Sequence, residues 1–319
     1  MDPARLAVLR ELGDRGSVTA TAAALHVSPS AVSQQLSALQ AQVRVPLTVK
    51  RGRTLVLTEA GEVLAAAAAR VEEALAEARG AVAAFLDEPE HPVGVAAFHS
   101  AGLALFAPLL REVDGRAQVS LVDADVAQDR FPGLTADHDL VIAHRLPHDP
   151  EWPRDRHVVV PLLVEPLDIA LPAGHPLAAQ EAIVPEQLRD ERWISVHEGF
   201  PLAGVLRHIG ALAGRTPHIS HRINEFSVAA EVVRTGAAIA ILPRMTAGPL
   251  ATDGLVLRPL EGTPVVRHVD VLARPEALAR ASVRLVLDAL RAVAGRAIDA
   301  ETGDGADRPR PRDSVHRVG

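Results

Sequence analysis

Residues 17–57 hold the feature that most limits the fold: two short helical stretches, a tight turn between them and a marked helix start. Ser28 is suited to cap a helix, and Pro29 is suited to its first position. Apolar side chains then recur at intervals of four and three residues up to Leu39, which is the spacing of a buried helix face. A shorter helical stretch, residues 19–26, precedes the turn. This order predicts a helix-turn-helix.

The second of these helices carries no charge, and no Lys, Arg, Asp or Glu occurs between Arg15 and Arg44. Base edges in the major groove are recognised by hydrogen bonds, which Ser and Gln can make. Small residues at the helix N-terminus also let its N–H groups approach phosphates. We therefore expect this helix to contact DNA through its outer face, formed by Pro29, Ser30, Ser33 and Gln34. The alternative is a small helical bundle in which these residues are only a solvated surface.

Basic charge is concentrated beside that helix. The chain has a net charge of −7, but residues 1–57 hold seven basic and three acidic side chains, or +4, which leaves −11 for the remainder. Such asymmetry is typical of a nucleic-acid-binding end on an acidic protein. Residues 45–49 and 54–57 predict a β-hairpin with a turn at Arg51-Gly52. Its tip would present Lys50, Arg51 and Arg53 to the DNA backbone or minor groove.

Residues 59–86 predict one long helix, because the first proline after them is Pro89. Apolar residues follow a heptad spacing along it, at Leu64, Ala68, Val71, Leu75, Ala78, Val82 and Phe85. A seam of this length needs a second helix to cover it, so we expect a dimer. The alternative is a single amphipathic helix that lies on its own domain.

The N-terminal residues resemble those of a known family. The matching positions are Ala22, Ala23, Leu25, Ser28, Ala31, Val32, Ser33, Leu36 and Leu39, then Lys50-Arg51-Gly52-Arg53 and Leu57-Thr58-Glu59-Ala60-Gly61. This pattern resembles the DNA-binding domain of LysR-type transcriptional regulators, closely over residues 1–86 and less strictly to 294. The resemblance implies a winged helix-turn-helix, an antiparallel linker-helix dimer and a domain that senses a small molecule. Thr48 departs from the usual aromatic residue, and Lys50 stands where Arg is usual.

From about residue 92 short apolar runs alternate with helical segments, the pattern of a parallel α/β sheet. Strands are expected at 93–98, 118–123, 140–143, 167–171, 193–196, 218–223, 239–242 and 267–273. Two stretches, 171–178 and 232–243, resemble the family's effector domain, which implies two periplasmic-binding-protein-like lobes joined by crossovers near 156–164 and 262–268. The fold class is therefore α/β multidomain.

The expected division of the chain has four parts. Residues 1–58 form the winged helix-turn-helix and 59–88 the linker helix. The effector domain covers 89–294, with lobe I at about 89–160 and 268–294 and lobe II at about 161–267. Residues 295–319 have no apolar period and are expected to be disordered.

Ligands of open α/β sheets bind beyond the carboxyl ends of strands, near helix N-termini. With the family resemblance, this principle selects an effector site from His99, Ser100, Asp125, His144, Glu198, Gly199, Phe200 and Phe226. Ser100 could instead be a plain N-cap, and the phenylalanines could be core contacts. Carboxylates at Asp123, Asp125 and Glu198 would favour an amine-bearing or cationic ligand, although solvated loop carboxylates explain them equally well.

Catalysis is not expected. Residues 98–102, Phe-His-Ser-Ala-Gly, follow a predicted strand as a nucleophile elbow does, but Phe98 replaces the first glycine and no triad order is evident. The sequence holds no phosphate-binding loop, dinucleotide fingerprint or zinc-protease motif, and its lack of cysteine excludes thiolate chemistry. His218 and His221 would point to opposite faces of a strand. We expect no cofactor and no metal.

The sequence thus predicts a cytoplasmic, ligand-responsive transcriptional regulator, since it shows neither a signal peptide nor a membrane span. Its expected partners are double-stranded DNA, with an interrupted inverted repeat as operator, and a small-molecule effector. We expect a homodimer through the linker helix and a homotetramer through the effector domains. The alternatives are an architectural DNA-binding protein without effector response and a Ser-dependent hydrolase.

Overall fold

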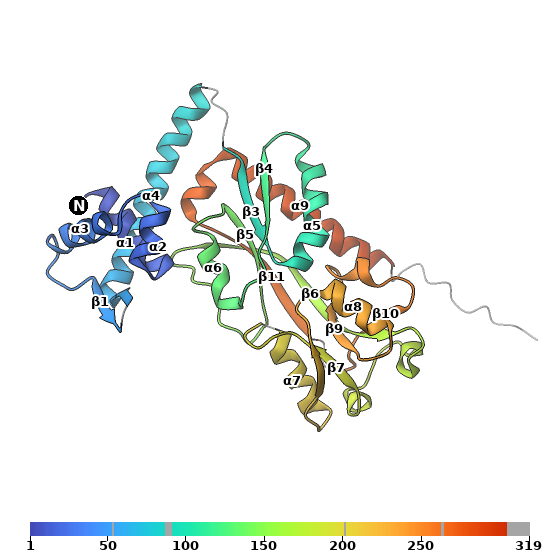
Figure 1. Ribbon diagram of the computed structural model, residues 1–319. Helices are drawn as coiled ribbons and strands as arrows, with labels where there is room; N and C mark the ends of the chain where they lie inside the picture. Colours follow the sequence, from blue (N-terminus) through green and yellow to red (C-terminus); the bar gives the residue numbers. More distant parts are fainter. Residues whose placement is uncertain (53, 87–90, 201, 263–264, 305–319) are drawn as a thin grey trace, which may run out of the picture.

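The computed structural model describes residues 1–52, 54–86, 91–200, 202–262 and 265–304. An N-terminal helical domain with a β-hairpin is followed by one long helix and a two-lobed α/β domain (Figure 1). The predicted fold class is confirmed.

Three helices and a hairpin form the N-terminal domain. They are α1 (Pro3–Arg15), α2 (Val18–Ala24), α3 (Pro29–Gln40), β1 (Thr48–Arg51) and β2 (Thr54–Leu57). The side chains of Leu9, Val32 and Leu39 are fully shielded from solvent in its core. Ser28 caps α3 as expected, because its Oγ accepts a hydrogen bond from Ala31 N at 3.1 Å.

The first strand of the hairpin was expected at residues 45–49, but β1 begins three residues later, at Thr48. Pro46 has no N–H to give to a ladder. The N–H of Leu47 donates to Gln40 Oε1 at 2.8 Å, and its carbonyl accepts from Thr58 N at 3.0 Å. This segment is therefore held by α3 and by the start of the next helix.

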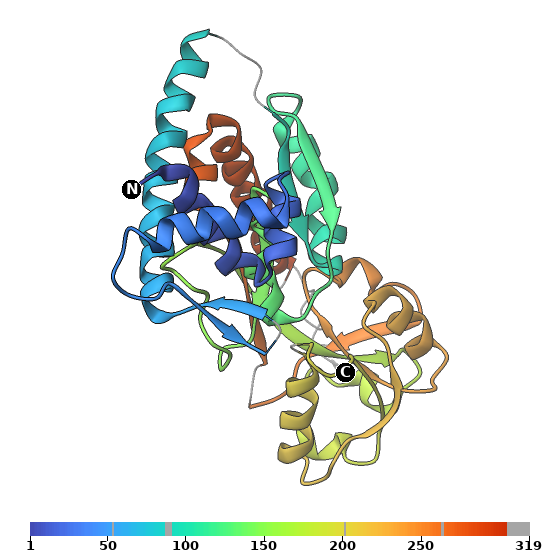
Figure 2. The same ribbon diagram turned by 60° about the vertical axis from the view of Figure 1, so that its left-hand side comes forward.

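The long helix α4 (Glu59–Leu86) starts where predicted, and Thr58 Oγ1 accepts from Gly61 N at 3.1 Å. Glycine is required at 61, because a Cβ there would lie 2.1 Å from the Leu47 carbonyl oxygen. The first part of α4 packs on the N-terminal core, and the rest projects beside lobe I (Figures 1 and 2). Apolar residues of its second half remain exposed, to 36% at Val71, 40% at Leu75 and 59% at Val82.

Lobe I is built on part of a seven-stranded sheet, in the order β4-β3-β5-β11-β6. Its strands are β3 (Val93–Ala97), β4 (Val119–Asp123), β5 (Leu140–Arg145), β6 (Val158–Pro172) and β11 (Val266–Ala273). The first three are parallel, whereas β11 runs antiparallel to both β5 and β6. The helices of this lobe are α5 (His99–Val113), α6 (Phe131–Leu134) and α9 (Ala281–Asp304).

Lobe II uses the second half of β6, which pairs antiparallel with β9 (Ala240–Pro243) and β10 (Leu255–Arg258). A parallel pair, β7 and β8, is joined to this sheet by a bridge between Trp193 and Ile239. The remaining elements of lobe II are β7 (Arg192–Ser195), β8 (His218–Arg222), α7 (Leu202–Leu212) and α8 (Phe226–Arg234). Short 3₁₀ helices are η1 (Gln128–Arg130), η2 (Pro176–Ala179), η3 (Pro185–Leu188), η4 (Gly248–Leu250) and η5 (Pro275–Ala279).

Three further expectations need correction. The strand expected at 167–171 is found, and the chain passes between the lobes near the expected crossover at 156–164, but the two are not separate: both belong to one continuous strand, β6. Strand β10 was not predicted, although its four apolar-rich residues are bounded by Gly254 and Pro259. Residues 295–304 were expected to be disordered, but they continue α9. The helix extends this far because Ile298 packs on the core of lobe I. The rest of that tail, 305–319, lies outside the described residues.

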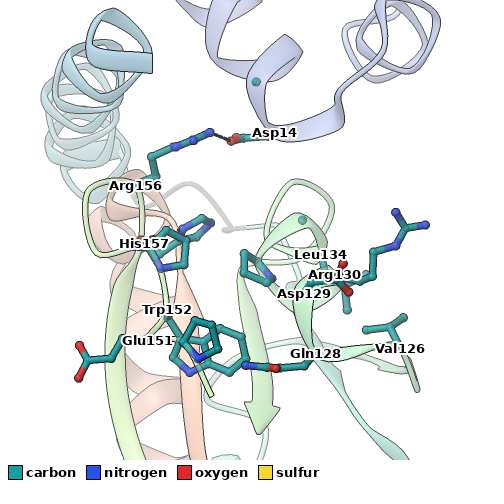
Figure 3. Close-up of a pocket in the computed structure, with 15 residues that line it drawn as sticks. Asp14, Val126, Gln128, Asp129, Arg130, Leu134, Glu151, Trp152, Arg156 and His157 are labelled. Atoms are coloured by element: carbon teal, nitrogen blue, oxygen red, sulfur yellow. Dashed lines mark hydrogen bonds and ion pairs between the residues drawn. The ribbon is translucent and has the colours of Figure 1, made fainter. Parts of the chain in front are cut away.

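A cluster of salt bridges connects the N-terminal domain to lobe I of the same chain. Arg274, directly after β11, binds Glu11 and Asp14 of α1, each at 2.6 Å. Arg156 binds Asp14 at 3.3 Å, as Figure 3 shows. Arg10 is almost fully buried and contacts Glu72 and, at 2.8 Å, Glu276. We call this set of contacts the junction.

The pKa values of Glu11 and Glu72 are shifted in opposite directions. Burial alone would raise the pKa of Glu11, but Arg274 and Arg15 together hold it below its ordinary value. At Glu72 burial dominates over the attraction of Arg10 and raises the pKa. Glu11 therefore contributes stability that is present above its unfolded-state pKa and is lost as pH falls through its lower folded-state pKa.

Replacing Arg274 by alanine tests the junction. Glu11 and Asp14 would stay largely buried without their main partner, so we expect the free energy of unfolding to fall by about 3 kcal/mol. Urea denaturation of the full chain measures this. Arg291→Ala is the matched control, because Arg291 is exposed and meets Asp288 only at 3.5 Å, so the expected loss is below about 1 kcal/mol. Equal losses in both variants would contradict a structural role for the junction.

Candidate functional site

The first candidate surface is the outer face of α3. Pro29, Ser30, Ser33 and Gln34 are all exposed, while the opposite side of the helix is buried. The Ser33 hydroxyl donates to Pro29 O at 3.0 Å, which leaves its oxygen free to accept another bond. This uncharged face offers hydrogen-bonding groups and no formal charge.

The hairpin supplies the charge that α3 lacks. Lys50 and Arg51 are exposed at the end of β1, opposite Leu55 and Thr54 of β2. Gly52 has a φ of 61°, the left-handed conformation that closes a tight hairpin. Arg53, the third predicted wing cation, lies outside the described residues. Figure 1 shows α3 and the hairpin at the end of the molecule away from lobe II.

The second candidate site is a cavity between the two lobes, which we call the cleft. Six of the eight predicted effector residues line it: His99, Ser100, Asp125, His144, Phe200 and Phe226. Glu198 is 66% exposed, does not line the cavity and instead pairs with Arg207 at 3.3 Å and Arg222 at 3.5 Å. Gly199, in the same turn, does not line it either.

Phe98, which ends a predicted strand beside His99, also lines the cleft. Sequence reasoning missed four other residues of the cleft: Val196, Leu202, Asn224 and Arg267. Asn224 follows the carboxyl end of β8, so the principle that selected the other residues could have found it. Arg267 stands inside a predicted strand, where no sequence signal distinguishes a cleft residue from a core residue.

Arg267 forms the floor of the cleft with Glu165, and both side chains are fully buried, at 1% and 0% exposure. Its Nε donates to Glu165 Oε2 at 2.8 Å, and its Nη2 donates to Ser100 Oγ at 2.9 Å. Glu165 also accepts from the backbone N–H groups of Met245 and Thr246. Both carboxylate oxygens of Glu165 and the Nε and Nη2 atoms of Arg267 therefore have hydrogen-bond partners.

Ser100 is not a helix cap, which settles the alternative considered from sequence. Phe98 occupies the N-cap position of α5, and no side chain caps this helix. The Ser100 oxygen accepts from Arg267, so its own proton remains available to donate. A hydrolase would need that hydroxyl beside an imidazole base, whereas here it meets a guanidinium.

His144 lies against aromatic rings in lobe I. Its ring centre is 4.4 Å from that of Phe98 and 5.6 Å from that of Phe131. Burial, together with the charge of Arg267, holds the pKa of His144 well below its ordinary value, so the imidazole is neutral. Its Nδ1 is buried and has no hydrogen-bond partner among the described residues.

His99 bridges the lobes across the cleft. Its Nδ1 contacts Asp123 of lobe I, and its Nε2 lies 3.3 Å from Glu225 Oε2 of lobe II. Asp125, the remaining carboxylate, has a pKa raised by burial. The enclosed space is about 30 Å³, so the lobes stand close together in this conformation.

A second cavity, of about 700 Å³, lies at the junction and is drawn in Figure 3. Its most shielded polar side chains are already satisfied. Trp152 Nε1 donates to Asp270 at 2.8 Å, and both ring nitrogens of His157 have partners. Arg156 Nε, in the lining of this cavity, is buried without a hydrogen-bond partner among the described residues, as His144 Nδ1 is in the cleft. We take the cleft as the ligand site because six of the predicted effector residues gather there.

Within the described ranges no group of three or more His, Asp or Glu side chains is placed to hold a metal ion. None of the helices described here is long and apolar enough to cross a membrane.

Comparison with known proteins identifies the family of each of the two domains. Residues 3–62 match the family described as "Bacterial regulatory helix-turn-helix protein, lysR family", and residues 86–295 match "LysR substrate binding domain". The transcriptional regulator CbbR of Xanthobacter flavus is 28% identical over 283 residues, which cover 85% of this chain and 82% of CbbR.

Solved structures share the fold. A full-length OxyR variant from Pseudomonas aeruginosa aligns with a TM-score of 0.63 at 20% identity, covering 91% of this chain and 95% of OxyR. CbnR complexed with its target DNA aligns with a TM-score of 0.50 at 21% identity, covering 92% of this chain and 100% of CbnR.

The buried pair beneath the cleft gives a sharp stability test. In Arg267→Met the Glu165 carboxylate loses its counter-charge, so the free energy of unfolding should fall by about 4 kcal/mol. The double variant Glu165→Gln with Arg267→Met leaves no buried charge and should recover more than half of that loss. Urea denaturation of both variants checks this. Equal instability of the single and double variants would show that the charge balance is not what stabilises the floor.

Proposed function

This chain belongs to the LysR family of bacterial transcriptional regulators, and from that premise we propose that α3 and the hairpin bind its operator while an effector in the cleft controls that binding or the bending of the DNA. The observation that carries the proposal is the pairing of an uncharged, exposed helix face with two exposed hairpin cations, Lys50 and Arg51, in a chain that also holds an interlobe cleft.

Several features support the DNA-binding part. Ser30, Ser33 and Gln34 offer donors and acceptors to base edges, and Pro29 starts the helix at the surface. Lys50, Arg51 and Arg53 supply the salt-dependent attraction to phosphates, which carries no sequence information. A protein of the same fold is known in complex with its target DNA. An interrupted inverted repeat as operator would match the two-fold symmetry of a dimer.

Measurements of operator binding distinguish base recognition by α3 from phosphate binding by the hairpin. The operator is sought in the DNA upstream of this gene, and affinity is measured by fluorescence anisotropy. Gln34→Ala should lower the affinity for the operator by about tenfold and leave the affinity for scrambled DNA unchanged. Lys50→Ala and Arg51→Ala should each weaken binding to the operator and to scrambled DNA by the same factor. Each should also reduce the slope of log affinity against log salt concentration by about 1. Arg111→Ala, on an exposed part of α5, is the control. Uniform weakening by Gln34→Ala would exclude base recognition by that residue.

The exposed half of α4 supports a homodimer. Val71, Leu75 and Val82 follow a heptad spacing, and α4 of a second copy would cover them. A further pairing through the effector domains would give a tetramer with two pairs of DNA-binding domains. Closure or opening of the lobes around an effector would then change the spacing of these pairs, and so the bend of the operator.

Leu75→Glu should break this dimer, since it places a charge in the seam. Analytical ultracentrifugation should show the apparent mass fall by half relative to the wild type. Leu212→Glu, which adds the same charge at a half-exposed position of α7, should leave the mass unchanged. An unchanged mass for Leu75→Glu would place the subunit contact elsewhere.

Two other functions are separable by experiment. An architectural DNA-binding protein would bind operator and scrambled DNA alike and would not respond to a ligand. The hydrolase is disfavoured because the Ser100 oxygen accepts a hydrogen bond from Arg267, and among the described residues no hydrogen bond joins its hydroxyl to a histidine. We place the protein in the cytoplasm, where its operator lies.

A further inference from the structure

One wall of the cleft is suited to a negative charge. Helix α5 has 15 residues, no side chain caps it, and its first residues, His99 and Ser100, line the cavity. The N–H groups and the dipole at such a terminus favour an anion. The Ser100 proton is free to donate, and Arg267 lies directly behind it at 2.9 Å. Arg267 itself is balanced by Glu165, so a carboxylate would find the Ser100 donor and the positive end of the α5 dipole together at this wall.

The adjacent position is suited to a positive charge. Asp125 follows β4, lines the same cavity and forms no salt bridge or hydrogen bond within the described ranges. Asp123 is differently placed, because His99 already pairs with it. His99 and Arg267 act on this half-buried carboxylate through space, without a direct contact, and a bound cation would supply the direct partner that it lacks.

A second, independent observation points to an occupant. His144 is more than nine-tenths buried, lines the cavity and has an Nδ1 atom with no partner among the described residues. Buried polar atoms are rarely left unpaired, and this one belongs to a residue that lines the cavity, where a ligand atom can reach it. Because His144 is neutral, it can form a hydrogen bond with a ligand without adding a charge to either wall.

The rest of the cavity is apolar except for Asn224 of lobe II, which carries no charge. Val196, Phe200, Leu202 and Phe226 of lobe II face the polar groups of lobe I. The group that a ligand presents to lobe II should therefore be uncharged. The space of about 30 Å³ holds no more than a water or two, so binding must part the lobes and separate His99 from Glu225.

We propose that the effector is a small zwitterion, an α-amino acid with an uncharged side chain. Its carboxylate binds at the N-terminus of α5 and Ser100, its ammonium group pairs with Asp125, and its side chain contacts Phe200 and Phe226. This inference rests on the proposed function, in which the cleft is the effector site. A simple acid would leave Asp125 repelled by the ligand, and a simple amine would leave the α5 wall without an anion.

The test uses the full chain and the twenty L-amino acids as probes, first by thermal melting and then by calorimetry. At least one free amino acid with an uncharged side chain should raise the melting temperature by several degrees at roughly a hundredfold excess over its Kd. Its N-acetyl and its amide derivatives, which each remove one charge, should bind at least about tenfold more weakly. No stabilisation by any of the twenty, or equal binding of either derivative, would overturn the proposal.

Variants locate the ammonium site. Asp125→Asn should reduce the affinity for the identified amino acid by at least about tenfold, whereas Glu181→Gln, an exposed carboxylate of lobe II outside the cavity, should not. Melting without ligand verifies that both variants fold. Unchanged affinity in a folded Asp125→Asn variant would overturn the assignment.

Operator binding distinguishes this inference from the function on which it rests. If the amino acid binds as expected and changes operator affinity or bending, both are supported. If it binds but leaves the DNA complex unaltered, the ligand class is supported and the proposed effector role fails. If operator binding responds only to a ligand that lacks one of the two charges, the function is supported and the zwitterion is excluded.

Discussion

The buried pair of Glu165 and Arg267 is the interaction on which the two-lobed domain depends. Glu165 lies on β6 and Arg267 on β11, the two strands that run between the lobes. A buried ion pair is tolerated only when its desolvation is offset by good geometry and further hydrogen bonds. Here the backbone N–H groups of Met245 and Thr246 and the hydroxyls of Ser100 and Thr246 supply those bonds. The pair thus fixes α5 and the start of lobe II to one point beneath the cleft.

Strand β11 also joins this point to the DNA-binding domain. Arg267 stands near its beginning and Arg274 follows its end, seven residues further on, or roughly 23 Å at about 3.3 Å per residue. Arg274 holds Glu11 and Asp14 of α1. One short strand therefore has a charged contact with the cleft at one end and with the helix-turn-helix domain at the other. A change in the cleft that moves β11 acts on α1 without a separate connecting element.

Some predictions from sequence succeeded because their signals are local. Ser28 and Pro29 marked the start of α3, Thr58 marked the start of α4, and alternation of apolar runs with helices located most strands. The errors arose where neighbours overrode local preference. Gln40 delayed the hairpin by binding Leu47, packing of Ile298 extended α9, and a single strand, β6, joined the expected crossover and strand.

The sequence by itself determined the family architecture and most of the residues that gather at the cleft, because caps, periodicities and strand ends depend on neighbours along the chain. Only the tertiary structure decided which of their charges are available. Glu198 is paired with Arg207 and Arg222, Asp123 is paired with His99, and Arg267 enters the site from a strand that gave no signal. Burial and pairing depend on residues tens to hundreds of positions apart, and spacing along one chain carries no record of those distances.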